Sequence, residues 1–412
     1  MLQGAKKLLS GSVLVVALQA VNFIALARIL GPTDFGAAAT ANAFAAIALP
    51  LAGLGFGNVL LMKAARNTPN LAVIAGNALL ANVASGLVLC AIATVTASAI
   101  ISPLDDKLLQ AFILILITEL VLIRTATVAA QLYAARSRFG LASSVNVISS
   151  VVRLSAIGAC IAYNDANLTG WSNWLFFLSL LYALLLGAAI RFEAKGLGFS
   201  LATMKADLGM GVSFSVGTLC KAVYTDGDKI FLAKFHEASS VGLYSSAYRL
   251  TSMSFMPVRA LLDASAHRFF QEGGKGLSSA LPVSWSVMRI ALPYTLMVAI
   301  ILYFGAPLLP LLLGSAYEGA TAILQIIAIL PLVQAIHYAL SDALTGANMQ
   351  ATRTKAQLSV AVAYITAASF FIPMYGPLGA AVVCVASEGL LAIIIFSLII
   401  FKRRKSVKAV NP

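Results

Sequence analysis

Four ionisable side chains lie within an otherwise apolar stretch of the sequence, KAVYTDGDKIF at 221–231. They are Lys221, Asp226, Asp228 and Lys229. On an insertion scale each charge costs about 2.5–3.5 kcal/mol at the centre of a membrane-spanning helix, so four cost roughly 10 kcal/mol, more than the apolar residues of such a span offset. A helix with this sequence must therefore face protein or water, where the charges could bind an anion, couple to a cation or form ion pairs.

The acidic part of this stretch also fits a second kind of chemistry. Asp226-Gly227-Asp228 has the Asp-x-Asp spacing with which many glycosyltransferases hold a metal-bound nucleotide sugar. A three-residue match is weak evidence, and nothing else in the sequence could hold a nucleotide. The four cysteines lie singly in apolar runs, which predicts neither a disulfide framework nor a zinc site. We therefore expect no metal, no cofactor and no catalytic residue.

The composition indicates what kind of element must position these charges. Of the 412 residues, 60% are hydrophobic and 10% are charged, whereas about a quarter of the residues of a soluble domain are charged. The chain is therefore predicted to be an all-α integral membrane protein. Its net charge of +13 does not indicate nucleic-acid binding, because no basic stripe is interleaved with aromatic residues.

Apolar stretches of about 17–25 residues predict membrane-spanning helices. Basic residues before the first stretch imitate a cleaved signal peptide, but polar residues interrupt that stretch and further spans follow, so we expect an uncleaved first helix. About twelve spans are predicted, near 10–30, 37–62, 72–101, 108–133, 141–162, 174–190, 210–233, 243–266, 283–304, 320–340, 357–373 and 378–401.

The basic residues outside these spans predict an orientation. With the N-terminus in the cytoplasm, eighteen of the 28 lysines and arginines fall in inside segments and two, Lys107 and Lys234, fall in outside loops. Cytoplasmic segments of membrane proteins carry such an excess. Both termini are therefore predicted to be cytoplasmic, and the basic tail 402–412 is predicted to lie against anionic lipid.

Two segments half a chain apart are similar. LARILGPTDFGAAATA at 26–41 aligns without gaps with LAKFHEASSVGLYSSA at 232–247, an offset of 206 residues. Both lie at the predicted outer end of a span. We therefore predict two six-helix lobes of the same orientation, residues 1–200 and 201–412, with a cytoplasmic linker near 191–209.

The remaining eight basic residues fall within the predicted spans together with five acidic residues, which leaves an excess of +3. A basic excess inside a bilayer needs an anion, and a bound phosphate satisfies it. The basic residues are Arg28, Arg124, Arg153, Lys221, Lys229, Arg249, Arg259 and Arg289, and the acidic residues are Glu119, Asp226, Asp228, Asp263 and Glu388.

Ion pairs between or within helices are the structural alternative for several of these charges. Arg259 and Asp263 are four residues apart and can neutralise each other on one helical face. Glu119 can pair with Arg124 or Arg153. A functional role is instead favoured for Arg28, Lys221 and Arg249.

Several motifs occur together in the order and spacing of a known family. They are ARILGPTDFG at 27–36, DKIFLAKF at 228–235, VGLYSSAYRL at 241–250, LPLLLGSAYEGA at 309–320 and IPMYGPLGAAVVCVASE at 372–388. These motifs resemble the polysaccharide-transporter family of the multidrug/oligosaccharidyl-lipid/polysaccharide (MOP) flippase superfamily. Within it they look like the Wzx-type flippases of O-antigen and exopolysaccharide repeat units, and the resemblance covers most of the chain.

This resemblance implies twelve to fourteen helices in two lobes around a central cationic cavity, working by alternating access. It implies a bacterial inner-membrane flippase that moves undecaprenyl-pyrophosphate-linked oligosaccharide units from the inner to the outer leaflet for lipopolysaccharide or exopolysaccharide synthesis. Its partners would be the lipid-linked substrate, membrane lipids, a polysaccharide polymerase and a chain-length regulator.

The resemblance and the charges together predict which residues form the site. We expect Arg28, Lys221, Lys229 and Arg249 to bind the pyrophosphate headgroup. Asp228 and Glu119 are candidates for coupling to H⁺ or Na⁺. The other charges expected in the cavity are those of Arg124, Arg153, Arg259, Asp263 and Arg289.

Two alternative functions differ from this one in what they require. A cation-coupled multidrug exporter of the same superfamily would favour an acidic cavity, which the excess of +3 opposes. A membrane polysaccharide polymerase would need catalytic groups at the outer surface, usually on large loops, whereas the predicted outer loops are short and none gathers arginine, histidine and acidic residues.

Overall fold

The computed structural model of the chain describes residues 2–65, 70–101 and 105–410. Every regular element in these ranges is a helix, which confirms the all-α prediction. The chain divides into two compact units, unit 1 at Met1–Lys234 and unit 2 at Phe235–Pro412. Side chains at 2–13, 65, 213–214, 216–218, 220–221, 224 and 403–410 are not described, so the predicted tail 402–412 lies almost wholly outside the described side chains.

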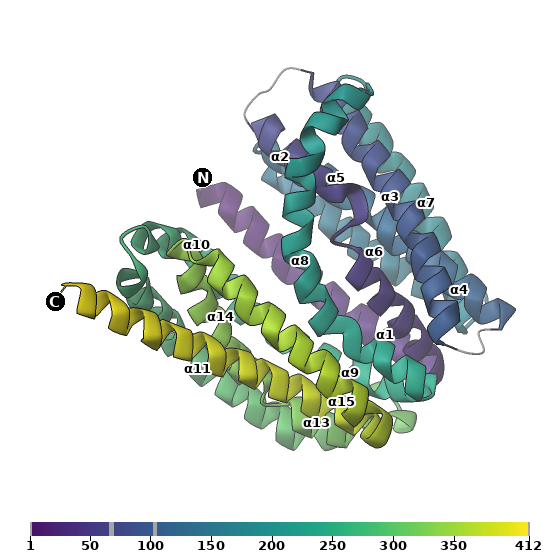
Figure 1. The fold of residues 1–412 in the computed structure, drawn as a ribbon. Helices are drawn as coiled ribbons and strands as arrows, with labels where there is room; N and C mark the ends of the chain where they lie inside the picture. The colour runs from purple at the N-terminus through teal and green to yellow at the C-terminus, as the bar shows by residue number, and fades with distance from the viewer. Residues whose placement is uncertain (1, 66–69, 102–104, 411–412) are drawn as a thin grey trace. The chain divides into compact units, whose positions relative to one another are not determined.

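The described residues of unit 1 form eight α-helices and two short helical segments, η1 and the π-helical η2. Two of its helices begin at side-chain caps: Asp105 accepts the backbone N–H of Leu108, and Asn167 accepts that of Gly170. The elements are α1 (Leu2–Ala48), η1 (Ala52–Gly55), α2 (Phe56–Ala65), α3 (Leu71–Ile100), α4 (Asp106–Ile117), η2 (Thr118–Leu122), α5 (Ile123–Ala135), α6 (Phe139–Ala162), α7 (Leu168–Glu193) and α8 (Leu201–Phe235), as labelled in Figure 1.

The end of the first predicted span is a kink within α1 rather than a loop. Gly31 has φ 67° and ψ 175°, and Pro32 follows it. A positive φ is open to glycine at little cost, and proline cannot donate a backbone hydrogen bond to the preceding turn. α1 therefore consists of two helical stretches that meet at these two residues.

The second predicted span, 37–62, is wrong as a single helix. It contains Pro50, and Gly53, Leu54 and Gly55 have φ values of 74°, 46° and 71°. Three successive residues with positive φ cannot continue a right-handed α-helix. The chain therefore leaves α1, passes through η1 and enters α2 as a separate ten-residue helix.

The core of unit 1 joins α2, α3, α5, α6 and α7. Phe56, Leu60 and Leu132 are buried in it, and so is most of Tyr182. The Tyr182 hydroxyl donates to the carbonyl of Val145 at 2.8 Å, which satisfies the polar end of the ring. Numerous alanines line the same contacts, and small residues let helices approach closely inside a membrane.

The predicted linker is attached to unit 1 by its backbone. The Gly198 N–H donates to the carbonyl of Ala72 at 3.0 Å, and the Asn77 amide exchanges two hydrogen bonds of 3.1 Å with the backbone of Ser200. A Cβ at Gly76 would collide with the Gly198 carbonyl, so glycine is what permits this approach. The linker is thus held along the first turns of α3.

The first half of α8 is also packed on unit 1. Lys63 at the end of α2 binds the Asp207 carboxylate, with an N–O distance of 2.6 Å. Gly211, four residues after Asp207 on α8, lies very close to Gly55. A Cβ on either glycine would meet backbone atoms of the other segment. The compact unit therefore extends past residue 200, and the division into lobes at that residue stays a prediction.

Unit 2 contains seven α-helices joined by short turns and 3₁₀ segments. They pack mainly as α10, α11, α14 and α15 side by side, with α13 between α9 and α15. The elements are α9 (Ala238–Ser254), α10 (Met256–Gly273), α11 (Leu277–Gly305), η3 (Ala306–Leu308), α12 (Leu309–Leu313), η4 (Ser315–Tyr317), α13 (Ala320–Ile327), α14 (Leu330–Gly346) and α15 (Gln350–Val410).

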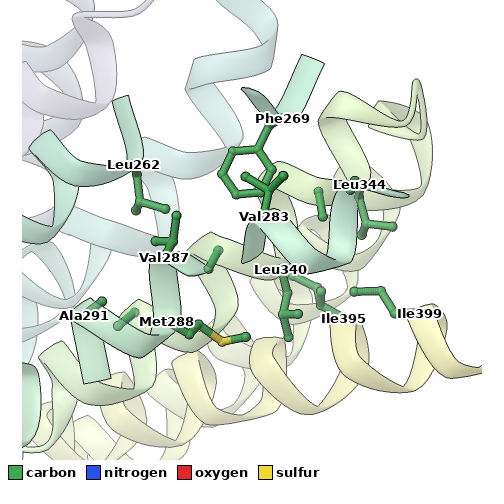
Figure 2. Close-up of a cluster of buried hydrophobic side chains, with 14 of the residues drawn as sticks. Leu262, Phe269, Val283, Val287, Met288, Ala291, Leu340, Leu344, Ile395 and Ile399 are labelled. Atoms are coloured by element: carbon green, nitrogen blue, oxygen red, sulfur yellow. The ribbon is translucent and has the colours of Figure 1, made fainter. Parts of the chain in front are cut away.

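The core of unit 2 lies where α10, α11, α14 and α15 meet. Figure 2 shows Phe269 of α10 against Val283 of α11, with Leu344 of α14 and Ile399 of α15 on the neighbouring helices. Alanines at the α11–α14 contact shorten the distance between these two helices. Because lipid is as apolar as these side chains, close packing rather than exclusion of water holds the four helices together.

α15 contains a kink at the place where the sequence predicted the gap between the last two spans. Gly376 has φ 57° and ψ −136°, and prolines precede and follow it. His236 Nε2 donates to the Ile372 carbonyl, four residues before the kink, at 2.8 Å. The predicted spans 357–373 and 378–401 thus correspond to two helical stretches that meet at this kink.

Eight of the described helices are long and apolar enough to cross a membrane. Their outward faces carry large exposed side chains such as Val95, 71% exposed, and Phe304, 75% exposed, which a bilayer would cover. The chain is therefore a multi-pass membrane protein. The count of twelve stays a prediction, because α8 carries four charges in eleven residues and the predicted span 243–266 is divided between α9 and α10.

The similar segments at 26–41 and 232–247 have one structural feature in common. Gly31, at the kink of α1, aligns with Glu237, which lies between the end of α8 and the start of α9. Both copies therefore change helix direction at the same aligned position. The duplication itself stays a prediction.

The orientation can be tested at four exposed positions. We expect single cysteines replacing Ala166 and Glu318 to react with an impermeant thiol reagent in intact spheroplasts, on a background without the native cysteines. Cysteines replacing Leu201 and Gly274 should react only after lysis, because the distribution of basic residues places them in the cytoplasm. All four side-chain positions are exposed, so a lack of reaction reports sidedness rather than burial. The reverse pattern would overturn the predicted orientation.

Candidate functional site

An ion pair between two segments of unit 1 joins Glu119 and Arg153. Arg153 Nη1 is 2.7 Å from Glu119 Oε1, and Nη2 donates to Oε2 at 2.8 Å. The guanidinium therefore contacts both carboxylate oxygens. Of the two partners predicted for Glu119, the structure selects Arg153. Arg124 is half-buried and has no ion-pair partner among the described residues.

Glu119 lies in η2, the π-helical segment between α4 and α5. A π-helical turn inserts an extra residue and turns the following side chains, and such turns are often found at functional sites. Here it brings the Glu119 carboxylate to Arg153 of α6. The sequence did not indicate this segment, because its composition, TELVL, is that of an ordinary apolar helix.

Asp226 and Asp228 of α8 are paired with a lysine of the same helix. Lys229 Nζ is 2.7 Å from Asp226 Oδ1 and 3.6 Å from Asp228 Oδ1. Asp228 is 1% exposed, and its carboxylate also accepts the backbone N–H of Lys229 at 2.8 Å. A protein cation already offsets the Asp-x-Asp carboxylates, and Lys229 is less available for a headgroup than predicted. The Lys221 side chain lies outside the described residues.

The two arginines expected at the headgroup belong to different units. Arg28 lies on α1 in unit 1, three residues before the kink at Gly31. Arg249 lies on α9 in unit 2. Both side chains are exposed.

The charged residues of α10 and α11 do not form the expected pair. In the described part of unit 2, Arg259 and Asp263 make no ion pair with each other, and the Arg259 guanidinium instead lies 5.9 Å from the centre of the Tyr338 ring. Arg289 is exposed and lines a surface hollow of about 450 Å³ together with Trp285 and neighbouring residues of α11.

Unit 2 contains a buried cluster of polar side chains that the sequence analysis did not predict. His337 Nε2 is 2.6 Å from Glu388 Oε2, and Gln334 Nε2 donates to Glu388 Oε1 at 3.0 Å. The sequence did place Glu388 among the acids within the spans, but His337 was not among the predicted site residues. The cluster could have been predicted from two ionisable residues that lie in separate apolar segments of the same half of the chain.

Ion pairs also brace the helix ends of unit 1 outside the predicted spans. Arg136 and Arg138, in the turn between α5 and α6, bind the two oxygens of Glu193 at 2.7 Å and 2.9 Å. Glu193 is at the end of α7 and is buried. These pairs fix helix ends and do not belong to the intramembrane charges.

Comparison with known proteins places the chain in a family. The family model described as polysaccharide biosynthesis protein matches residues 1–265, which is more than half of the chain. No curated protein matches.

Solved structures of the MOP superfamily share the fold over almost the whole chain. A multidrug resistance MATE family transporter in an inward-facing conformation is 15% identical, with a TM-score of 0.75 and coverage of 97% of this chain and 96% of that one. The lipid II flippase MurJ in an inward closed conformation is 11% identical, with a TM-score of 0.72 and coverage of 97% and 87%.

A further structure of this superfamily comes from Pyrococcus furiosus and is described as having a binding pocket of reverse polarity. It is 13% identical, with a TM-score of 0.68 and coverage of 97% of this chain and 96% of that one. These proteins are transporters and a flippase rather than enzymes. The chain therefore belongs to the polysaccharide biosynthesis protein family and has the fold of the MOP superfamily.

Proposed function

We propose that this protein is a flippase for undecaprenyl-pyrophosphate-linked oligosaccharide units in the bacterial inner membrane. The observation that carries the proposal is the set of arginines on apolar helices of this chain. The chain belongs to a family described as polysaccharide biosynthesis proteins. Arg259 and Arg289 are exposed and have no acidic partner in the described part of the chain. Such cations within apolar helices need an anion, and a pyrophosphate supplies about two negative charges and several acceptor oxygens.

The headgroup would be bound mainly by arginine. A guanidinium forms two parallel hydrogen bonds with a phosphate and remains charged in an apolar environment, which a lysine does less well. We propose Arg28 and Arg249 as headgroup ligands, with Lys221 as a third. We propose a smaller part for Lys229, because two carboxylates already offset its charge.

The transport cycle would be alternating access, in which the substrate site opens first to the cytoplasmic leaflet and then to the outer one. The protein would then deliver repeat units to a polymerase and a chain-length regulator at the outer face. The basic excess also separates this function from export of cationic drugs, since a lipophilic cation would be repelled by the same arginines.

The substrate class can be tested by binding. We expect the purified chain in nanodiscs to bind undecaprenyl pyrophosphate at least tenfold more tightly than undecaprenol, which corresponds to about 1.4 kcal/mol from the headgroup. Inorganic pyrophosphate should compete, and added salt should weaken binding because the attraction is electrostatic. Ethidium is the control ligand and should bind weakly. Tight ethidium binding that pyrophosphate does not affect would overturn the flippase proposal and favour a drug exporter.

A further inference from the structure

Arg289 is the one charged residue in the sequence of α11, Leu277–Gly305. Its side chain is exposed, and none of the ion pairs in the described part of the chain includes it. A charge within an apolar helix is costly unless something neutralises or hydrates it. The counter-charge of Arg289 must therefore come from solvent or from a bound anion.

The face of α11 that carries Arg289 is apolar toward the C-terminal end of the helix. Its large side chains there are between 50% and 75% exposed, namely those of Leu296, Met297, Ile300 and Phe304. Figure 2 shows the opposite face, where Val283 and Val287 point into the core of unit 2. Large exposed apolar side chains in a row are what a membrane helix presents to lipid tails, whereas a water-filled cavity favours polar ones.

The length of this apolar face puts Arg289 at one edge of the hydrocarbon layer. Exposed apolar side chains begin at Ile290 and continue past the end of α11 to Leu308. These residues are 18 apart (308 − 290), which is about 27 Å at 1.5 Å per residue and close to the roughly 30 Å of a hydrocarbon core. Arg289 and Trp285 therefore belong at the level of the lipid headgroups, at the end of α11 that is predicted to be cytoplasmic.

The hollow of about 450 Å³ on unit 2 lies at this level. It is lined by Arg289 and Trp285 together with the smaller side chains of Pro282 and Ser286. The Ser286 hydroxyl donates to the Pro282 carbonyl at 2.9 Å, so its hydrogen is already used. The donors that remain in this set are the Arg289 guanidinium and the Trp285 indole N–H. Two donor groups without an acceptor of their own suit an anion that carries several oxygens.

We propose that this hollow binds the phosphate of an anionic phospholipid. The Arg289 guanidinium forms two hydrogen bonds with phosphate oxygens, Trp285 lies beside the headgroup, and the acyl chains lie along the exposed apolar face of α11. The headgroup of phosphatidylcholine carries its own cation, which Arg289 repels, whereas phosphatidylglycerol has none. The anion assigned to Arg289 is thus a membrane lipid, and the site does not depend on the proposed transport function.

The fluorescence of Trp285 tests this site with lipids alone. The chain has three tryptophans, and Trp171→Phe with Trp174→Phe leaves Trp285 as the last one. Trp171 Nε1 has no hydrogen-bond partner in the described part of the chain, so phenylalanine loses none there. Brominated acyl chains quench a tryptophan that they contact. In phosphatidylcholine vesicles, we expect brominated phosphatidylglycerol to occupy the position beside Trp285 about fivefold more strongly than brominated phosphatidylcholine, the factor for one arginine near an anionic headgroup.

Substitution of the arginine should remove this preference. Arg289→Gln should bring the two lipids to equal occupancy, and Arg289→Lys should keep part of the preference because it keeps the charge. Added salt should weaken the preference of the protein that has Arg289. As the matched control, Arg191→Gln removes an exposed arginine of unit 1 and should leave the fivefold preference unchanged. If the single-tryptophan protein does not fold, native mass spectrometry of the wild-type chain and Arg289→Gln, each with equal amounts of both lipids, measures the same difference.

Three results would overturn the proposal. Equal occupancy by the two lipids in the protein that has Arg289 would make this residue a general interfacial anchor. No quenching by either lipid would mean that a second copy of the chain or another protein covers this face. Displacement of brominated phosphatidylglycerol by undecaprenyl pyrophosphate in an amount equal to the protein would assign the hollow to the flippase substrate. The vesicles otherwise contain no lipid-linked substrate, so failure of the flippase proposal would leave the lipid preference intact.

Discussion

Replacing Arg28 or Arg249 by alanine should reduce surface-polysaccharide export at least tenfold while the protein remains in the membrane at its normal level. Both arginines are exposed on their helices, so alanine creates no cavity and the fold should persist. A charge-assisted hydrogen bond contributes about 1.5–3 kcal/mol, so loss of one guanidinium should weaken headgroup binding about tenfold to a hundredfold. Export is measured by complementation of a strain that lacks its own flippase.

Matched substitutions distinguish a headgroup contact from a general charge effect. Arg28→Lys and Arg249→Lys should recover part of the export, because lysine keeps the charge and loses the two-bond geometry. Arg191→Ala in unit 1 and Arg268→Ala in unit 2 remove exposed arginines outside the intramembrane set, and they should export like wild type. Wild-type export by both Arg28→Ala and Arg249→Ala would show that these two arginines do not bind the headgroup.

The sequence predicted the helices well and their breaks less well. Hydropathy locates long apolar segments because a bilayer requires helices of a set length, and the spans near 72–101 and 141–162 correspond closely to α3 and α6. Breaks depend on local backbone geometry that composition hardly records. At Gly31 and Gly376 two helical stretches meet at a kink without a loop, while the glycines near residue 55 separate α2 from α1.

The sequence predicted the partner of Glu119 because only two candidates were near, and Arg153 is the one that binds it. Lys229 was expected at the headgroup, although Asp226, which binds it, lies only one turn away. Spacing alone predicted the wrong partner for Arg259. Its guanidinium lies over the ring of Tyr338, which belongs to another helix.

His337 and Glu388 show the limit of such inference. They are 51 residues apart in the sequence, and their contact depends on how α14 and α15 pack. The sequence separation of two residues on different helices does not determine how those helices pack. Structure was therefore needed to distinguish this histidine from the other two.

The largest effect on stability should come from breaking the Glu119–Arg153 pair. Glu119→Ala leaves a largely buried guanidinium without its counter-charge, and loss of one partner of a buried ion pair costs about 3–5 kcal/mol. The double variant Glu119→Leu/Arg153→Met should recover most of that loss, because apolar side chains of similar volume can replace such a pair at little cost. Thermal unfolding of the purified chain measures both.

The exposed pair of Glu272 and Lys275 provides the control for this experiment. Its lysine is 64% exposed, and such a pair contributes about 0–1 kcal/mol, so Glu272→Ala should hardly move the unfolding temperature. A Glu119→Ala protein as stable as wild type would mean that water reaches Arg153. A double variant less stable than either single variant would mean that the pair itself, rather than the avoidance of an unpaired charge, holds η2 against α6. The π-helical turn would then depend on this one contact, and its loss should straighten the segment between α4 and α5.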